Sequence, residues 1–78
     1  MTDAANLAHY YAGACFLKKG EYISAVDHLS EFSSDDLLIQ GRAYALIGDA
    51  NVEMENYDEA VLYAEKVLSN SKIDNKYK

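Results

Sequence analysis

The chain has 78 residues, half of them apolar, with no proline, and it carries a formal net charge of −6 at pH 7. Its length allows one small domain, and its apolar content excludes a disordered or low-complexity chain. Nucleic acid and anionic membrane surfaces are excluded as partners because both require a basic footprint, and no segment clusters Lys or Arg.

The first half of the chain predicts two helices. Apolar and small residues recur at helical spacing from Ala4 to Lys18. Gly20 follows, and glycine suits the left-handed conformation just beyond a helix end. A second helix is predicted from Tyr22 to Phe32, and one face of it carries Ala25, Val26, Leu29 and Phe32.

The second half predicts two more helices after a break at "SSDD", Ser33–Asp36, which offers capping oxygens and negative charge to the next helix. The third helix is expected from Leu37 to Met54 and the fourth from Tyr57 to Leu68. The residues expected to point inward are Leu38, Tyr44, Ala45, Ile47 and Gly48 on the third, and Ala60, Val61, Ala64, Val67 and Leu68 on the fourth. No segment alternates as a strand does, so the chain is predicted to be all-α. The short connections make successive helices antiparallel.

The chain also repeats itself at one constant offset of 35 residues, as from Tyr22 to Tyr57. The first copy is carried by "AGACFLKKGEYISAVDHL" and the second by "IGDANVEMENYDEAVLYAEKVL". These residues resemble the tetratricopeptide repeat family, whose unit is a pair of antiparallel helices of about 34 residues. The resemblance implies one unit over residues 1–78, with repeat 1 at about 6–39 and repeat 2 at about 41–74. It also implies an α-α superhelix, in a fragment of a longer, bacterial-type protein of this family.

The pattern predicts close helix packing inside each copy. Gly13 and Gly48 lack side chains and would let the paired helix approach, with Ala25 and Ala60 as the small residues that face them. The space around these contacts would be filled by larger residues, namely Phe16, Leu29, Phe32, Ile47, Tyr44 and Val67.

The second copy departs from the first at two positions. Asn51 stands where the first copy has Phe16, and a polar group at such an inward position costs about 1 to 3 kcal/mol unless its amide is paired. Glu55 stands where the first copy has Gly20. The second repeat is therefore expected to be the weaker one.

Two interpretations of the turn around Glu55 follow. In the favoured one, Asn56 adopts the left-handed conformation and the hairpin closes as in the first copy. In the other, the third and fourth helices form one continuous rod of roughly 30 residues, about 45 Å long, and a second chain supplies the missing contacts by exchange. Gly20, Glu55 and Asn56 are thus the predicted turn or hinge residues.

No catalytic, cofactor-binding or metal-ligating constellation is expected, so the chain is not predicted to be an enzyme. His9 and His28 lack partners at metal-ligand spacing. Cys15, the single cysteine, is expected to be a small buried hydrophobe and cannot form an internal disulfide. No apolar run approaches the roughly 18 to 20 residues of a membrane span, and the compartment is left open.

By resemblance, the first helices of successive repeats would line a concave groove that holds a peptide or helix of a partner protein. The groove residues implied in this chain are Leu7, Tyr10, Leu17, Lys18, Arg42, Asp49, Val52 and Glu53, together with Ala14 and Ala45. One subgroup of the family grips C-terminal carboxylates with Lys and Asn, but here Tyr10, Ala14 and Leu46 stand at those positions. A partner with apolar anchors and some basic character is the better expectation.

The leading functional hypothesis is a non-catalytic protein-protein interaction module. The alternative is a structural element that self-associates as a homodimer, possibly by helix exchange through a continuous third and fourth helix.

Overall fold

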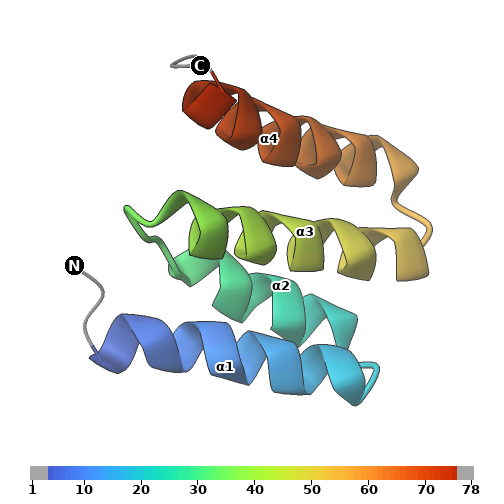
Figure 1. Ribbon diagram of the computed structural model, residues 1–78. Coiled ribbons are helices and arrows are strands. Elements are labelled where there is room, and N and C mark those ends of the chain that lie inside the picture. Colours follow the sequence, from blue (N-terminus) through green and yellow to red (C-terminus); the bar gives the residue numbers. More distant parts are fainter. Residues whose placement is uncertain (1–3, 76–78) are drawn as a thin grey trace.

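The computed structural model describes residues 4–75, including the side chains of residues 4–70. It contains four helices and, in that part of the chain, no strand, which confirms the all-α prediction. The helices are α1 (Ala4–Lys18), α2 (Tyr22–Glu31), α3 (Leu37–Glu53) and α4 (Tyr57–Asn75). Figure 1 shows that successive helices reverse direction, so that α1 and α3 run the same way.

The predicted helix boundaries are confirmed except at the end of α4. Helix α1 agrees, and α2 and α3 each end one residue earlier than expected. Helix α4 continues past Leu68 to Asn75 and is 19 residues long. The segment beyond Leu68 contains neither Gly nor Pro, so nothing in it terminates the helix.

The two hairpins, α1–α2 and α3–α4, turn in the same way. Gly20 has a φ of 79°, and Glu55, at the equivalent position, has a φ of 62°. In the first turn the N–H of Glu21 donates to the carbonyl of Phe16 at 2.9 Å, and in the second the N–H of Asn56 donates to the carbonyl of Asn51 at 2.8 Å. The N–H of Gly20 also donates to the carbonyl of Leu17, and that of Glu55 to the carbonyl of Val52, so each turn is a Schellman motif.

This geometry corrects the prediction for the second turn. Glu55 itself, not Asn56, adopts the left-handed conformation, because it occupies the position directly after the last helical residues, where Gly20 stands in the first copy. Helices α3 and α4 are separate and pack against each other, so the continuous rod is not the conformation of this structure.

Asn51 is buried and its amide is paired, so it avoids the cost expected for an unpaired polar group at this inward position. Its Nδ2 donates to the carbonyl of Ile47 at 2.9 Å, and its Oδ1 accepts from Nδ2 of Asn56 at 3.5 Å. A Schellman turn commonly places an apolar contact between these two positions. Here an amide pair takes its place.

The core lies where α3 packs on the first hairpin. Its buried apolar residues are Ala25, Leu29, Phe32, Ala43, Ile47 and Ala50. Gly41 and Gly48 face α4, since a Cβ added to them would meet Asn70 and Tyr63. Ala43 and Ala50 are on the opposite side of α3, because residues two and nine positions along a helix from Gly41 point away from it. That side of α3 contacts α2.

Gly13 is required for close packing in the first hairpin. A Cβ at Gly13 would lie 2.5 Å from Cγ of Leu29 and 3.2 Å from the carbonyl oxygen of Ala25. A Cβ at Gly48 would instead lie 3.6 Å from Cβ of Tyr63, which is ordinary contact. The prediction of a close approach is therefore confirmed at Gly13 and wrong at Gly48.

Several residues predicted to point inward are exposed. Cys15 is exposed, as are Leu38 at 74%, Val61 at 57% and Leu68 at 61%. Ala45 and Ala64 are exposed as well. In the part of the chain that the structure describes, no further helix packs on the second hairpin as α3 packs on the first. Positions that a following repeat would bury are therefore exposed to solvent.

Candidate functional site

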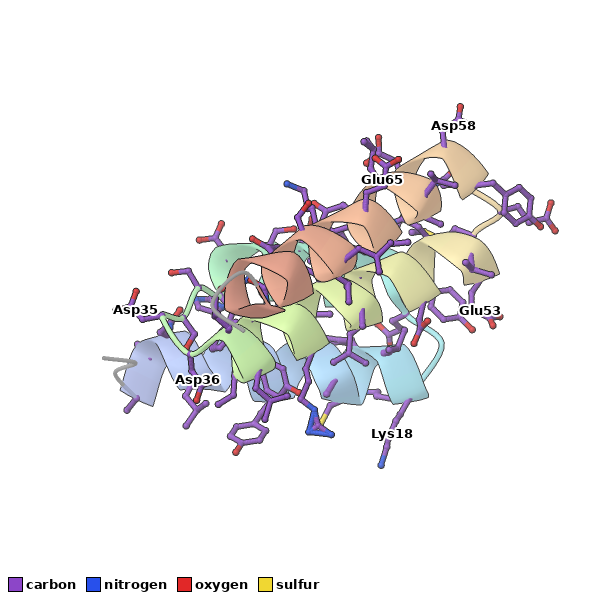
Figure 2. The ribbon with its side chains drawn as sticks, turned by 45° about the horizontal axis from the view of Figure 1, so that its top comes forward. Lys18, Asp35, Asp36, Glu53, Asp58 and Glu65 are labelled. Atoms are coloured by element: carbon purple, nitrogen blue, oxygen red, sulfur yellow. The ribbon has the colours of Figure 1, made fainter. Side chains whose placement is uncertain are left out.

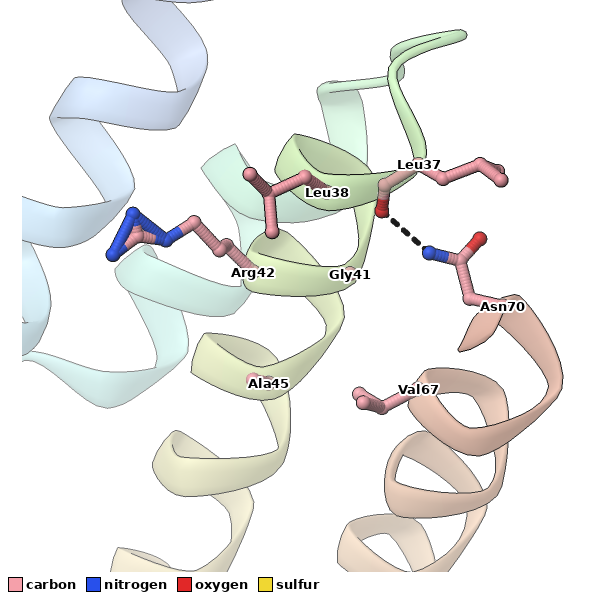
Figure 3. Close-up of a pocket in the computed structure, with 7 residues that line it drawn as sticks. All are labelled: Leu37, Leu38, Gly41, Arg42, Ala45, Val67 and Asn70. Carbon is pink, nitrogen blue, oxygen red and sulfur yellow. Dashed lines mark hydrogen bonds between the residues drawn. The ribbon is translucent and has the colours of Figure 1, made fainter. Parts of the chain in front are cut away.

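An apolar groove runs between α3 and α4 on the face that no other described helix covers. Its α3 side is lined by Leu38, Arg42, Ala45, Gly48, Asp49 and Val52, and its α4 side by Ala60, Ala64, Val67 and Leu68. Figure 3 shows the end nearest the start of α3, where Val67 and Ala45 face the same space. We call this surface the α3–α4 groove.

The groove walls are held by contacts between the two helices. Asn70 Nδ2 donates to the carbonyl of Leu37, which ties α4 to the start of α3 (Figure 3). The rings of Tyr44 and Tyr63 lie 6.1 Å apart beneath the floor, and Lys66 lies over both rings. The start of α3 is capped by Asp36, whose Oδ1 accepts from the N–H of Leu38 at 3.0 Å. The groove therefore has a defined shape without an occupant.

The same positions in the first hairpin are buried, on a helix that packs against both α1 and α3. Ala25, Leu29 and Phe32 are at most 3% exposed, whereas their equivalents in the second hairpin, Ala60, Ala64 and Val67, are half-buried or exposed. The α3–α4 groove is thus the second copy of a surface that, in its first copy, already accepts a helix.

The structure brings together four of the ten predicted groove residues. Arg42, Ala45, Asp49 and Val52 line the α3–α4 groove, whereas Ala14 is half-buried on α1. Leu7, Tyr10 and Leu17 are half-buried on α1, while Lys18 and Glu53 are exposed at the ends of α1 and α3.

Tyr10 is partly used for packing inside the first hairpin. Its ring centroid lies 5.2 Å from that of Phe32 and 5.6 Å from that of Tyr11. Arg42, in contrast, is exposed, and its side chain points away from Val67 and Asn70 at the edge of the groove (Figure 3).

Charge is distributed unevenly along the molecule. Figure 2 places Lys18, at the end of α1, and Glu53, at the end of α3, at the same end of the molecule as Asp58. Around the second turn, Glu55, Asp58 and Glu59 line a hollow formed by residues 55–59. The α3–α4 groove therefore ends beside a concentration of negative charge.

His9 and His28 are in contact in the structure, although their spacing in the sequence did not predict it. Their Nδ1 atoms lie 3.2 Å apart, so one ring donates and the other accepts, and the His28 ring stacks on Phe16 at 5.3 Å. The pair links α1 to α2. Its separation of 19 residues follows no helical or metal-ligand spacing, so sequence reasoning missed it.

The residues that the structure describes contain no group of three or more His, Cys, Asp and Glu side chains placed to hold a metal ion. Within the same range, no helix is long and apolar enough to cross a membrane. Comparisons with protein-family models, with curated proteins and with solved structures find no match.

Proposed function

We propose that this chain is a non-catalytic protein-protein interaction module that binds an amphipathic helix in the α3–α4 groove. The observation that carries the proposal is the difference in burial between equivalent positions. Leu29 is 1% exposed in the first hairpin, where it lies against Gly13 of α1 on the helix that packs against α3, and its equivalent Ala64 is exposed in the open groove. Burying such a surface is favourable by about 25 cal/mol per Å² of apolar area.

The lining defines the kind of helix that fits. The floor is formed by small residues, Gly48, Ala60 and Ala64, which allow a helix backbone to come close. The rims carry Val52, Val67 and Leu68, which supply apolar contact to anchors at helical spacing. With Asp49 on one rim and the acidic turn beyond it, the bound helix carries basic side chains at that end.

The tetratricopeptide-like arrangement belongs to this proposal. It is supported by the constant offset of the sequence, by the two matching Schellman turns and by the packing of α3 on the first hairpin. In such an arrangement the exposed residues Arg42, Ala45 and Val52 form the rim between the groove and the concave face. A peptide on that face would contact Lys18 and Glu53 as well.

A peptide of residues 37–54, which comprises α3 and its C-cap Met54, provides a direct test because α3 packs on the first hairpin. Fluorescence anisotropy of the labelled peptide should show saturable binding to the chain. Ala64→Glu, which places a charge on the groove floor, should weaken binding at least tenfold. Leu62→Glu, on the same helix but on the face away from the groove, is the matched control and should bind as the parent chain does.

The proposal fails if the peptide does not bind the parent chain at millimolar concentration. It also fails if Ala64→Glu and Leu62→Glu bind equally well. Circular dichroism of each variant confirms that both retain the helical fold, since Ala64 and Leu62 are exposed.

Self-association is the second candidate function. The helix-exchange route is not supported, because α3 and α4 form a closed hairpin. A different observation favours association of intact copies: the outer face of α1 is uncovered and is the repeat equivalent of the α3 face that packs on α2.

A further inference from the structure

Resting on the proposed function, we infer that the helix accepted by the α3–α4 groove is α1 of a second copy of this chain. Copies then stack head to tail, each presenting its α1 to the groove of the next. The inference starts from the only place in the described chain where a helix already occupies this kind of surface, namely α3 on the first hairpin.

The face of α3 that makes this contact has an exposed counterpart on α1. Ala43 and Ala50 are completely buried where α3 packs on the first hairpin. Their equivalents, 35 residues earlier, are Ala8 and Cys15. Both are exposed, and Tyr11 between them is 59% exposed. Small residues at both ends of this face allow the same close approach, with a large aromatic residue beside them.

The charges at one end of the proposed contact also indicate that α1 of a second copy is the partner. In the first hairpin, a hollow formed by residues 20–24 at the start of α2 is closed on one side by Met54 of α3. The equivalent hollow, residues 55–59, is open and carries three carboxylates, Glu55, Asp58 and Glu59. The equivalent of Met54 is Lys19, which is 63% exposed. A second copy's α1 would therefore place a cation at the acidic hollow.

This interface joins two different faces of the molecule. Helices α1 and α3 run in the same direction (Figure 1), so a copy docked by its α1 leaves its own α3–α4 groove free. Such a heterologous contact does not close on itself as a two-fold dimer does. Association is then open-ended and rises with concentration.

Complementary variants test the geometry. Ala64→Glu blocks the groove and leaves α1 intact, whereas Ala8→Glu blocks α1 and leaves the groove intact. Both positions are exposed, so both variants should remain folded. In sedimentation velocity from micromolar to millimolar concentration, the parent chain should gain mass with concentration and each variant alone should stay a monomer. An equimolar mixture should give a species of two chains that grows no further.

The matched controls are Leu62→Glu and Lys66→Glu, at exposed positions outside the interface, which should associate as the parent chain does. Lys19→Gln, which removes the cation, should weaken association and reduce its sensitivity to salt. A parent chain that stays monomeric at millimolar concentration overturns the inference, and so does a mixture in which the two blocked variants do not pair. If the chain stays monomeric yet binds the α3 peptide, the inference fails and the proposed function stands. If the peptide also fails to bind, the proposed function fails too.

Discussion

Glu55 holds a left-handed backbone conformation in which an L side chain is disfavoured by about 1 to 2 kcal/mol relative to glycine. Glu55→Gly should therefore raise the free energy of unfolding by about 1 kcal/mol, as read from urea denaturation followed by circular dichroism. Glu65→Gly, at an exposed position inside α4, is the matched control and should lower it by about 1 kcal/mol, because glycine is disfavoured inside a helix. Equal destabilisation by both variants would contradict the turn geometry.

Gly13 and Gly48 occupy equivalent positions but differ in the space beside them. Gly13→Ala should destabilise the chain by about 1 to 3 kcal/mol, because its Cβ would overlap Leu29 and press on the backbone of α2. Gly48→Ala should be neutral or stabilise the chain by up to about 1 kcal/mol through better helix propensity. Thermal unfolding of the two variants side by side decides the matter, and an equal loss at both positions would show that α3 and α4 approach more closely than in this structure.

Helix α3 packs against both α2 and α4, so the N-cap that holds its start contributes to the stability of the whole fold. The Asp36 carboxylate accepts from the N–H groups of Leu38 and Ile39 at 3.0 and 3.4 Å. Asp36→Ala should lower the free energy of unfolding by about 1 kcal/mol, whereas Asp36→Ser, which can still accept, should keep most of it. Chemical denaturation measures both, and an equal loss for the two substitutions would mean that the cap bond contributes nothing.

The helices and turns were predictable from the sequence because each depends on the local pattern of residues. The helical spacing located all four helices, and the repeat offset located both turns, since each depends on nearby residues. Burial was less predictable, because helical spacing alone does not say which sides of a helix have neighbours. Ala43 and Ala50 are core residues and Ala8 is exposed, yet all three are alanines and their residue type does not distinguish them. For the same reason the groove between α3 and α4, and the pairing of His9 with His28, required the structure.

At the scale of the whole molecule, the buried core lies mainly on the two middle helices, α2 and α3. Within the side chains that the structure describes, α2 contributes Ala25 and Leu29 to the buried core and α4 contributes none. A helix held on one side opens locally more often than one packed between two others. Native-state hydrogen exchange should therefore give backbone amides of α4 lower free energies of opening than those of α2 and α3. Filling the α3–α4 groove, with the α3 peptide or with a second copy, should raise protection in α4 and leave α2 unchanged. Uniform protection across the four helices would mean that the chain unfolds as one unit, and that the exposed groove does not weaken the helix that forms its wall.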